Sequence, residues 1–338
     1  MTIRSVFIGV FPPPMGGVTV KNQLLLDELS KNHGMKKIDL HAKPIALQFI
    51  KAYFEALRSN NIIIGLDTKR LKVVIALISL IPGALSKCRV FIMGGIANRI
   101  IEEDKALKRA LKKTKKMYVE TTGMLDSFVN CGFENVDMFP NCKSEVNALN
   151  PIISKKTDPI RLLFFSRICK EKGISFVMDS VKELDKKGIN FSIDFFGPIS
   201  SDIEDDFYRF IDAYSQVTYC GIFNTVNDNV YKKMNDYDIL MFPTVWKAEG
   251  VPGCLVEAKM SGITVIASNC CHNAEIIRQQ ENEGIIVNDD YSLEITEAVS
   301  YLSNDRALLN LMKRKSFESR LRYSVEHYQN VFDECIYS

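Results

Sequence analysis

The chain has 338 residues, which at about 150 residues per domain predicts two domains. Apolar residues make up 46% and charged residues 25%, a composition that excludes a disordered chain, a collagen and a coiled coil. The net charge of +2 hides an asymmetry, because residues 1–150 hold 22 Lys and Arg against 13 Asp and Glu, a net +9, whereas residues 151–338 hold 21 against 28, a net −7. This asymmetry indicates an anionic partner for the first half, such as a membrane surface, a phosphorylated ligand or nucleic acid.

The cysteines and the apolar runs indicate the cellular compartment of the protein. The nine cysteines are scattered without a C-x-x-C pair, which predicts a reduced, cytoplasmic protein without a zinc site. Only a short apolar run precedes three prolines near the start, so we expect no secretory signal. The longest nearly apolar run, residues 73–85, is shorter than the about 20 residues of a membrane-spanning helix and is interpreted as a buried helix.

In the first half, short apolar runs alternate with amphipathic stretches. Strands are predicted at 3–11, 62–65, 89–93 and 117–119, and helices at 18–29, at 71–80, beyond Gly95 and toward Asn130. Buried strands that alternate with helices predict an α/β fold with a parallel sheet covered on both faces.

A stretch of Pro, Asn and small polar residues at 139–157 interrupts this pattern and predicts a linker. A second alternating unit follows, with strands predicted at 161–165, 190–196, 217–220, 238–242, 264–267 and 284–287 and helices from about 307 to 335. We therefore expect a first Rossmann-like domain at 1–148, a second at 149–315 and a C-terminal helix at 316–338. Two such doubly wound domains would bind ligands in a cleft between the carboxyl ends of their strands.

Two carboxylates in the second half, Glu249 and Glu257, flank a Gly-Val-Pro-Gly turn. Pro252 cannot lie inside a helix and Gly253 frees the backbone, so a helix over 254–260 is predicted to begin here. Its free N–H groups would form an anion site. Each carboxylate alone could equally be a solvated acid or a complement to the helix dipole.

Two cations follow the first strand of the second domain. Arg167 lies at the strand's carboxyl end and Lys172 beside the next helix, so both could converge on one phosphate group. A solvated basic loop is the alternative interpretation, and the predicted cleft and anion site favour the phosphate.

Glycine pairs follow two strands of the first domain. Gly16 and Gly17 come after the first strand, where backbone could approach a phosphate closely, and Gly94 and Gly95 end another strand with Arg99 one turn further on. The first loop is not the G-x-G-x-x-G dinucleotide fingerprint, which argues against a hydride-transfer enzyme.

At these residues the sequence resembles the family 4 retaining glycosyltransferases, which have two Rossmann-like domains in the GT-B arrangement and build bacterial capsule, exopolysaccharide or O-antigen. The matching segments are Pro14-Met15-Gly16-Gly17, Phe139-Pro140-Asn141, Arg167 with Lys172-Gly173, and Glu249-Gly250-Val251-Pro252 with Glu257-Ala258. They occur in order across nearly the whole chain, and the paired glutamates with seven residues between them are the most specific.

The resemblance implies a role for each matching residue. Arg167 and Lys172 would hold the donor diphosphate, Glu249 the donor sugar and Glu257 the ribose hydroxyls. The implied donor site also includes Gly250, Gly253, Cys254, Leu255, Gly16, Gly17 and Gly197, and the implied acceptor side Gly94, Gly95 and Arg99. In such enzymes the leaving diphosphate helps to deprotonate the incoming hydroxyl on the same face, so neither a protein nucleophile nor a metal ion or other cofactor is expected. The resemblance also implies that residues 1–148 bind the acceptor, that residues 149–315 bind the nucleotide sugar, and that the helix at 316–338 crosses back to the first domain. The donor it implies is a UDP-sugar rather than a GDP-sugar, and the acceptor a lipid-linked glycan or an oligosaccharide.

Two segments depart from the family's pattern. Many relatives have a His where this chain has Met93, and residues 269–273 read NCCHN where a glycine pair is common. His272, in that second segment, is the one histidine worth following, although a surface loop histidine is the simpler interpretation.

A basic stretch is the remaining signal of the first half. Its cations fall at i, i+3, i+4, i+7, i+8 and i+11, which predicts one helix face made of Lys105, Lys108, Arg109, Lys112, Lys113 and Lys116. A solvated helix surface and a face toward an anionic membrane both remain open, since each cation near such a leaflet contributes about 1 kcal/mol. No nucleic-acid recognition motif accompanies the stretch, so we expect no nucleic-acid partner.

The resemblance thus implies a glycosyltransferase, and together with the basic first half it leads us to expect an enzyme that acts at the cytoplasmic face of the plasma membrane. Two other functions share the architecture: a nucleotide-sugar 2-epimerase, and a non-catalytic relative that binds a nucleotide sugar. The epimerase would need acid–base carboxylates and histidines that cannot be placed here.

Overall fold

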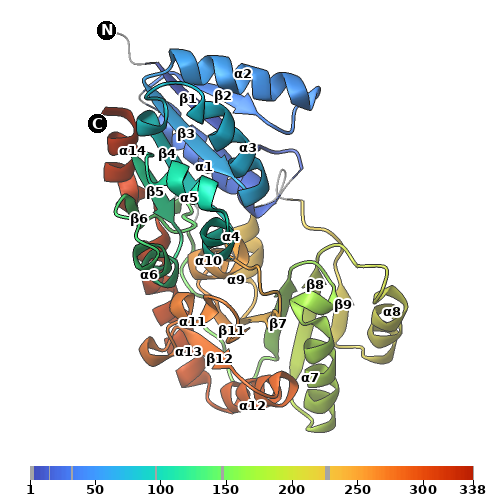
Figure 1. The fold of residues 1–338 in the computed structure, drawn as a ribbon. Coiled ribbons are helices and arrows are strands. Elements are labelled where there is room, and N and C mark those ends of the chain that lie inside the picture. The colour runs from blue at the N-terminus through green and yellow to red at the C-terminus, as the bar shows by residue number, and fades with distance from the viewer. Residues whose placement is uncertain are drawn as a thin grey trace. The chain divides into compact units, whose positions relative to one another are not determined.

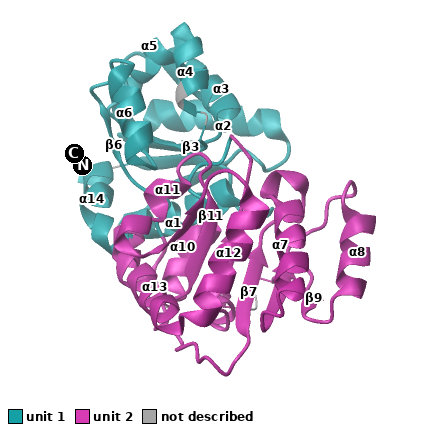
Figure 2. Ribbon diagram, turned by 90° about the horizontal axis from the view of Figure 1, so that it is seen from below, with its two compact units in different colours: residues 1–142, 248–252, 325–338 teal, residues 143–247, 253–324 magenta. Residues whose placement is uncertain are grey.

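A computed structural model describes residues 4–14, 16–31, 33–95, 97–145, 148–224 and 229–337. The chain divides into two compact units (Figure 2). The first comprises Met1–Cys142, Ala248–Pro252 and Val325–Ser338, and the second comprises Lys143–Lys247 and Gly253–Ser324. A short loop of the second half of the sequence, Ala248–Pro252, therefore belongs to the first unit.

The first unit is built on a six-stranded parallel sheet with the order β2-β1-β3-β4-β5-β6 (Figure 1). Its strands are β1 Ser5–Gly9, β2 Met35–Asp39, β3 Asn61–Leu66, β4 Cys88–Ile92, β5 Lys116–Val119 and β6 Val136–Met138. The strands are short and those at the centre are buried along their whole length, as expected for a sheet covered on both faces.

Alternate strand residues of this sheet contribute to two separate cores. Val6 and Ile8 of β1 pack in one cluster with α2 to α6, whereas Phe7 packs in the other with α1 and α14. The helices are α1 Gly17–Ser30, α2 Ile45–Arg58, α3 Thr68–Ser79, α4 Ala97–Glu103, α5 Lys105–Leu111, α6 Thr122–Asn130 and α14 Gln329–Tyr337, with the 3₁₀ turn η1 Leu85–Lys87. The last helix of the chain thus completes the core of the first unit.

The second unit has a six-stranded parallel sheet with the order β12-β11-β10-β7-β8-β9. Its strands are β7 Ile160–Phe165, β8 Phe191–Phe196, β9 Val217–Tyr219, β10 Ile239–Phe242, β11 Thr264–Ser268 and β12 Gly284–Val287. Its helices are α7 Ile174–Lys186, α8 Glu204–Ala213, α9 Val230–Asn235, α10 Gly253–Met260, α11 Asn273–Ile276, α12 Tyr291–Asn304 and α13 Arg306–Glu318. Its 3₁₀ turns are η3 Lys170–Lys172, η4 Gln279–Glu281 and η5 Ser319–Tyr323. A further 3₁₀ turn, η6 Val325–Tyr328, belongs to the first unit.

This architecture confirms the predicted α/β fold with two doubly wound parallel sheets. Two details differ from the sequence analysis. The apolar run 73–85 is not one buried helix, because α3 ends at Ser79 and both Val73 and Leu80 are exposed. The sequence analysis also assigned no strand to β2 or β6, which are the edge strands of the first sheet and are only partly buried.

The predicted basic helix is likewise shorter than expected. α5 ends at Leu111, where the Thr114 hydroxyl donates a hydrogen bond to the Leu111 carbonyl at 2.7 Å and the chain turns into β5. Lys105, Lys108 and Arg109 share the helix, whereas Lys112 is its C-cap and Lys113 follows in the turn. Lys116 lies in β5, 3.3 Å from the Asp137 carboxylate. The six cations therefore do not form a single helix face.

Candidate functional site

The two predicted phosphate-binding cations follow the carboxyl end of β7, whose neighbour in the second sheet is β10. Arg167 follows the end of β7 and is exposed. Lys172 ends η3 and is 8% exposed, with its Nζ 5.4 Å from the centroid of the Phe242 ring at the end of β10. Burial raises the pKa of the Cys169 thiol between them, so this side chain stays protonated and adds no negative charge.

Two glycines allow the strand ends of this unit to pack closely. Gly173 has a φ of +76°, and a Cβ there would lie 2.0 Å from the Pro243 carbonyl oxygen. Gly197 has a φ of +141°, and its Cβ would lie 1.9 Å from the Ser166 carbonyl oxygen. Any larger residue would push the Arg167 segment away from the ends of β8 and β10, so both glycines have a structural reason to be where they are.

The helix that follows β10 begins where the sequence predicts, since α10 spans Gly253–Met260. Leu255 is fully buried, while Gly253 and Cys254 are half-buried at the amino end of the helix. The first amides of a helix have no partner within it, so this end can bind an anion. Glu257 lies one turn further along α10, with its Oε1 2.6 Å from the Lys143 Nζ. Lys143 thus adds a positive charge that the sequence analysis did not include in the site.

In the first unit, Gly16 and Gly17 form the start of α1, and Met15 of the same motif lies outside the described residues. Gly16 is extended with a φ of −172°, and the Thr19 hydroxyl donates to the carbonyls of Pro14 and Gly16 at 2.9 and 3.0 Å. Within the described part of the chain, no heavy atom beyond the neighbouring residues lies within 4 Å of where a Gly17 Cβ would be. The fold therefore leaves open space beside Gly17.

The Gly94-Gly95 loop supports the Glu249 loop within the first unit. The Gly95 amide donates to the Ala248 carbonyl at 3.3 Å, and a Cβ on Gly95 would lie 1.9 Å from the Glu249 carbonyl oxygen. Gly94 adopts a φ of +103°, in the region that favours glycine. The structure thus brings Gly95 against the Glu249 loop, whereas Arg99 is exposed on α4.

A buried ion pair that the sequence analysis missed anchors the same loop. Lys21 of α1 and Glu120, directly after β5, are 3% and 6% exposed, with Nζ and Oε1 2.7 Å apart. The other carboxylate oxygen, Oε2, accepts a hydrogen bond from the Val251 amide at 3.3 Å. A Cβ on Gly250 would lie 2.7 Å from this oxygen, so Gly250 allows the contact.

Asn141 of the Phe139-Pro140-Asn141 motif holds the loop from its other side. Its Nδ2 donates to the Val251 carbonyl at 2.9 Å, and the side chain is 6% exposed. Phe139 lies against the Lys21 ammonium, with Nζ 5.5 Å from the ring centroid. The motif that contributes to the family resemblance therefore fixes the loop that carries Glu249.

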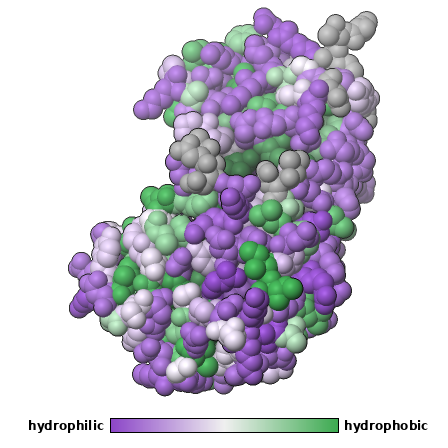
Figure 3. Space-filling model, turned by 180° about the vertical axis from the view of Figure 1, so that it is seen from behind, coloured by the Kyte–Doolittle hydropathy of each residue, from purple (hydrophilic) through white to green (hydrophobic). Residues whose placement is uncertain are grey.

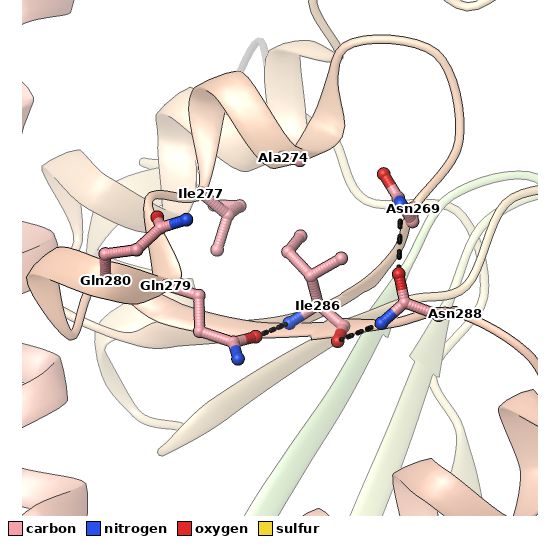
Figure 4. Close-up of a pocket in the computed structure, with 7 residues that line it drawn as sticks. All are labelled: Asn269, Ala274, Ile277, Gln279, Gln280, Ile286 and Asn288. Carbon is pink, nitrogen blue, oxygen red and sulfur yellow. Dashed lines mark hydrogen bonds between the residues drawn. The ribbon is translucent and has the colours of Figure 1, made fainter.

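A pocket of about 380 Å³ beside β12 is separate from these residues (Figure 4). It is lined by Asn269, Ala274, Ile277, Gln279, Gln280, Ile286 and Asn288. The Ile286 amide donates to Gln279 Oε1 at 2.7 Å and Asn269 Nδ2 donates to Asn288 Oδ1 at 2.9 Å, so much of the polar lining is already paired. His272 is the N-cap residue of the short helix α11 next to this pocket.

Two features are absent from the residues that the structure describes: a metal-binding cluster and a membrane-spanning helix. Over these residues, no three or more His, Cys, Asp and Glu side chains are grouped so that they could hold a metal ion. No helix within the same part of the chain is both long enough and apolar enough to span a bilayer.

A large part of the chain matches a known protein family. Residues 159–305 match the family described as "Glycosyl transferases group 1". This match covers β7 to α12, including Arg167, Lys172, Glu249 and Glu257.

Two curated proteins are distant relatives. One, from Klebsiella pneumoniae, is named "Uncharacterized 41.2 kDa protein in cps region" and is 26% identical over 202 residues, which are 60% of this chain and 49% of that protein. The other, "Capsular polysaccharide biosynthesis glycosyltransferase CapH" of Staphylococcus aureus, is 26% identical over 180 residues, 51% of this chain and 49% of that protein. The chain thus spans about half the length of the curated relatives it matches.

Solved structures extend the likeness to the whole chain. "Crystal structure of Anabaena Alr3699/HepE in complex with UDP and glucose" is 15% identical and matches with a TM-score of 0.73, over 99% of this chain and 100% of that one. Identity at this level shows a shared fold alone.

Proposed function

Because this chain belongs to the group 1 glycosyltransferases with the GT-B fold, we propose that it transfers a sugar from a nucleotide-diphosphate sugar to a glycan acceptor with retention of configuration. The observation that carries the proposal is the gathering of positive charge at the carboxyl ends of β7 and β10. Lys172 and the amino end of α10 follow these two strands, and Arg167 follows β7. A diphosphate leaving group needs positive charge of this kind.

Four charged residues of the second unit have a role in this proposal. Arg167 and Lys172 bind the diphosphate, and the amides of Gly253, Cys254 and Leu255 bind its edge. Glu257 accepts hydrogen bonds from the ribose hydroxyls, while Lys143, with its Nζ 2.6 Å from the Glu257 carboxylate, holds that carboxylate in place. The Anabaena structure that shares the fold holds UDP, which supports a UDP-sugar as donor.

The chemistry follows from where charge develops. As the bond from the sugar to the diphosphate breaks, negative charge grows on the departing oxygen, and fixed cations and helix amides stabilise it more in the transition state than in the ground state. The leaving diphosphate takes the proton of the incoming hydroxyl on the same face of the sugar, so no side chain has to act as nucleophile. Glu249 binds the sugar hydroxyls, and Gly94 and Gly95 support its loop. The positive charges of the chain itself are the basis for proposing a reaction without a metal ion.

The acceptor belongs to the same proposal. A lipid-linked glycan of a bacterial surface polysaccharide is supported by the capsule relative and by the net charge of +9 in residues 1–150, which would hold the protein at the cytoplasmic face of an anionic membrane. Gly16, Gly17 and Arg99 of the first unit are the residues proposed to face the acceptor side.

Donor binding is the first property to test. Thermal unfolding would be followed with UDP, GDP, ADP and CMP and their common sugars, since a ligand at 100 times its Kd raises the free energy of unfolding by about 2.7 kcal/mol. We expect UDP to stabilise the wild type, and we expect Arg167→Ala to abolish both this shift and the transfer of labelled sugar to a bacterial lipid extract.

Lys170→Ala is the matched control, because Lys170 lies three residues away and faces Asp202 at 3.5 Å instead. This variant should bind the nucleotide as the wild type does. Normal transfer by Arg167→Ala would disprove the proposed diphosphate site. Conversion of the sugar without an acceptor would identify an epimerase, and donor binding without transfer to any acceptor would identify a non-catalytic relative.

A further inference from the structure

Helix α2 of the first unit exposes four of its large apolar residues, whereas Phe49 and Tyr53 of the same helix pack against the core. Leu47, Ile50, Phe54 and Leu57 are 41%, 53%, 48% and 50% exposed, and their spacing of three, four and three residues places them on one face. We call these four residues the apolar face of α2. Ile45, at the start of the helix, is also 51% exposed.

The opposite side of α2 explains how the helix is held with this orientation. Ala52 and Ala56 are buried against the sheet, and their small side chains let the helix lie close to it. Glu55 is 8% exposed and its Oε2 accepts from Arg4 Nη2 at 2.7 Å, with Lys36 Nζ 3.6 Å from the other oxygen. The inward side thus combines small residues, a paired polar residue and two partly buried aromatic residues, and the four residues of the apolar face are left toward solvent.

The exposed charges of α2 are all positive. Lys51 and Arg58 are exposed beside the apolar face, and Lys43 precedes the helix. Glu55 is the only acid among residues 45–58, and it is buried and paired. The neighbouring helix α3, which contacts α2, adds an exposed Val73 and the exposed Lys69.

Among the other residues that the structure describes, the exposed apolar side chains do not form such a face. Figure 3 draws one side of the molecule, on which hydrophobic side chains occur in small groups among hydrophilic ones. Leu293 and Tyr301 of α12 are 50% and 59% exposed but are eight residues apart, without a run of apolar residues between them on the surface.

We propose that the apolar face of α2 inserts into the surface of an anionic lipid bilayer. An exposed helix with large apolar side chains flanked by lysine and arginine has the composition of helices that lie in the membrane interface, where the apolar side chains enter the acyl boundary and the cations meet the headgroups. A second copy of the chain fits less well, because a symmetric contact through this face would gather the exposed cations of two copies of α2 in one interface, with no exposed acid of α2 to pair with them. The proposal extends the membrane location proposed above, but it concerns α2 and requires no glycosyl transfer.

Sedimentation of the full chain with vesicles tests this directly. We expect the protein to bind vesicles of phosphatidylcholine mixed with phosphatidylglycerol, and to bind pure phosphatidylcholine much less. The double variant Ile50→Gln/Phe54→Gln should lower the partition coefficient by about tenfold or more, because it removes two large apolar side chains from the lipid contact. Lys51→Glu/Arg58→Glu should lower it similarly on the mixed vesicles alone.

The matched control is Leu293→Gln/Tyr301→Gln, which removes two equally exposed apolar side chains from the second unit. This variant should bind vesicles as the wild type does, and all variants should keep the wild-type circular dichroism spectrum and unfolding midpoint. Unchanged vesicle binding by Ile50→Gln/Phe54→Gln would overturn the proposal, as would a wild type that stays in the supernatant. A dimer in light scattering that this variant dissociates would assign the face to a second copy instead. Donor binding by these variants is a separate readout, so failure here leaves the proposed function standing.

Discussion

At Gly17 the fold does not require a glycine, so the effect of a larger side chain there reports on the proposed substrate. A glycine is required where a Cβ would strike protein, as at Gly95 and Gly197, and there the fold alone accounts for it. At Gly17 a Cβ would meet open space, and the residue begins α1 with ordinary helical backbone. If a substrate uses that space, a methyl group would harm the reaction without harming the fold.

Gly17→Ala is therefore expected to raise the free energy of unfolding by about 0.4–1 kcal/mol, because alanine loses less backbone entropy in a helix, and to reduce sugar transfer strongly. Denaturant unfolding and transfer assays would be measured on the same preparation. Gly34→Ala is the control, since Gly34 also faces open space but lies outside the proposed site. Full transfer by Gly17→Ala would remove Gly17 from the substrate site.

Site residues that are close together in the sequence could be predicted from the sequence alone. Residues that form pairs across long sequence separations could not. Arg167 and Lys172 are five positions apart in one loop, and the pattern of strand, loop and helix indicates that both lie at the same strand end. Lys21 and Glu120 are 99 residues apart, and Lys143 and Glu257 are 114 apart. Neither pair has a local pattern, because each exists only once the strands of its unit have assembled.

At the scale of elements, the loop Ala248–Pro252 is held by hydrogen bonds from residues far away in the sequence. Val251 is held through its amide by Glu120 and through its carbonyl by Asn141, and the Gly95 amide binds Ala248. Neither Glu120 nor Asn141 needs to touch a substrate for this, so we regard both as positioning residues for Glu249.

Asn141→Ala should therefore reduce kcat by about tenfold to a hundredfold through misplacement of Glu249. The Kd for the nucleotide should stay unchanged, because the diphosphate is proposed to bind residues of the second unit. Steady-state kinetics together with calorimetric titration of the nucleotide would separate these two effects.

Asn235→Ala provides the comparison for this variant. Asn235 is a similarly buried amide that donates to two carbonyls, those of Asn150 and Ser261, within the second unit. Its loss should lower the unfolding midpoint and leave kcat unchanged below that temperature. Equal losses of kcat in both variants would mean that general destabilisation, not the loop, is responsible.

Buried elements followed from the sequence more readily than half-exposed ones. The central strands are continuous apolar runs between loops and were predicted near their observed positions. β2 reads Met-Lys-Lys-Ile-Asp and lies at a sheet edge, where polar residues are tolerated, so no apolar run marks it. The predicted basic helix is longer than α5, because lysines continue at helical spacing past Leu111 in the sequence, whereas in the structure β5 begins at Lys116.

For the whole molecule, the second unit depends on charges that are buried in its core. Asp238 and Lys313 are each 1% exposed and 2.8 Å apart, and Glu283 and Lys259 are 2% and 0% exposed and 2.7 Å apart. Burial acts to raise the pKa of both carboxyls, but the charges and hydrogen bonds of their partners hold each pKa below its usual range. Such pairs stabilise the fold only while both members are charged.

Acid should therefore unfold the second unit through these carboxylates. A carboxyl with a lowered pKa in the folded state contributes stability that is complete above its unfolded value of about 4 and is lost as the pH falls through the folded value. The single tryptophan, Trp246, lies in the second unit, so its fluorescence reports the unfolding of that unit during an acid titration. We expect a cooperative fluorescence change below about pH 4, with full stability between that point and neutrality.

Asp238→Asn tests the link between this titration and the buried pair. The variant should lose about 3–5 kcal/mol of unfolding free energy at neutral pH, because Lys313 is then buried without its counter-charge. Asp238→Asn/Lys313→Met removes both charges, and it should recover much of that loss and show a weaker dependence of stability on pH in the acid range. If the double variant is as unstable as the single one, or if its stability falls with acid as steeply as that of the wild type, the pair is not what makes the second unit sensitive to acid.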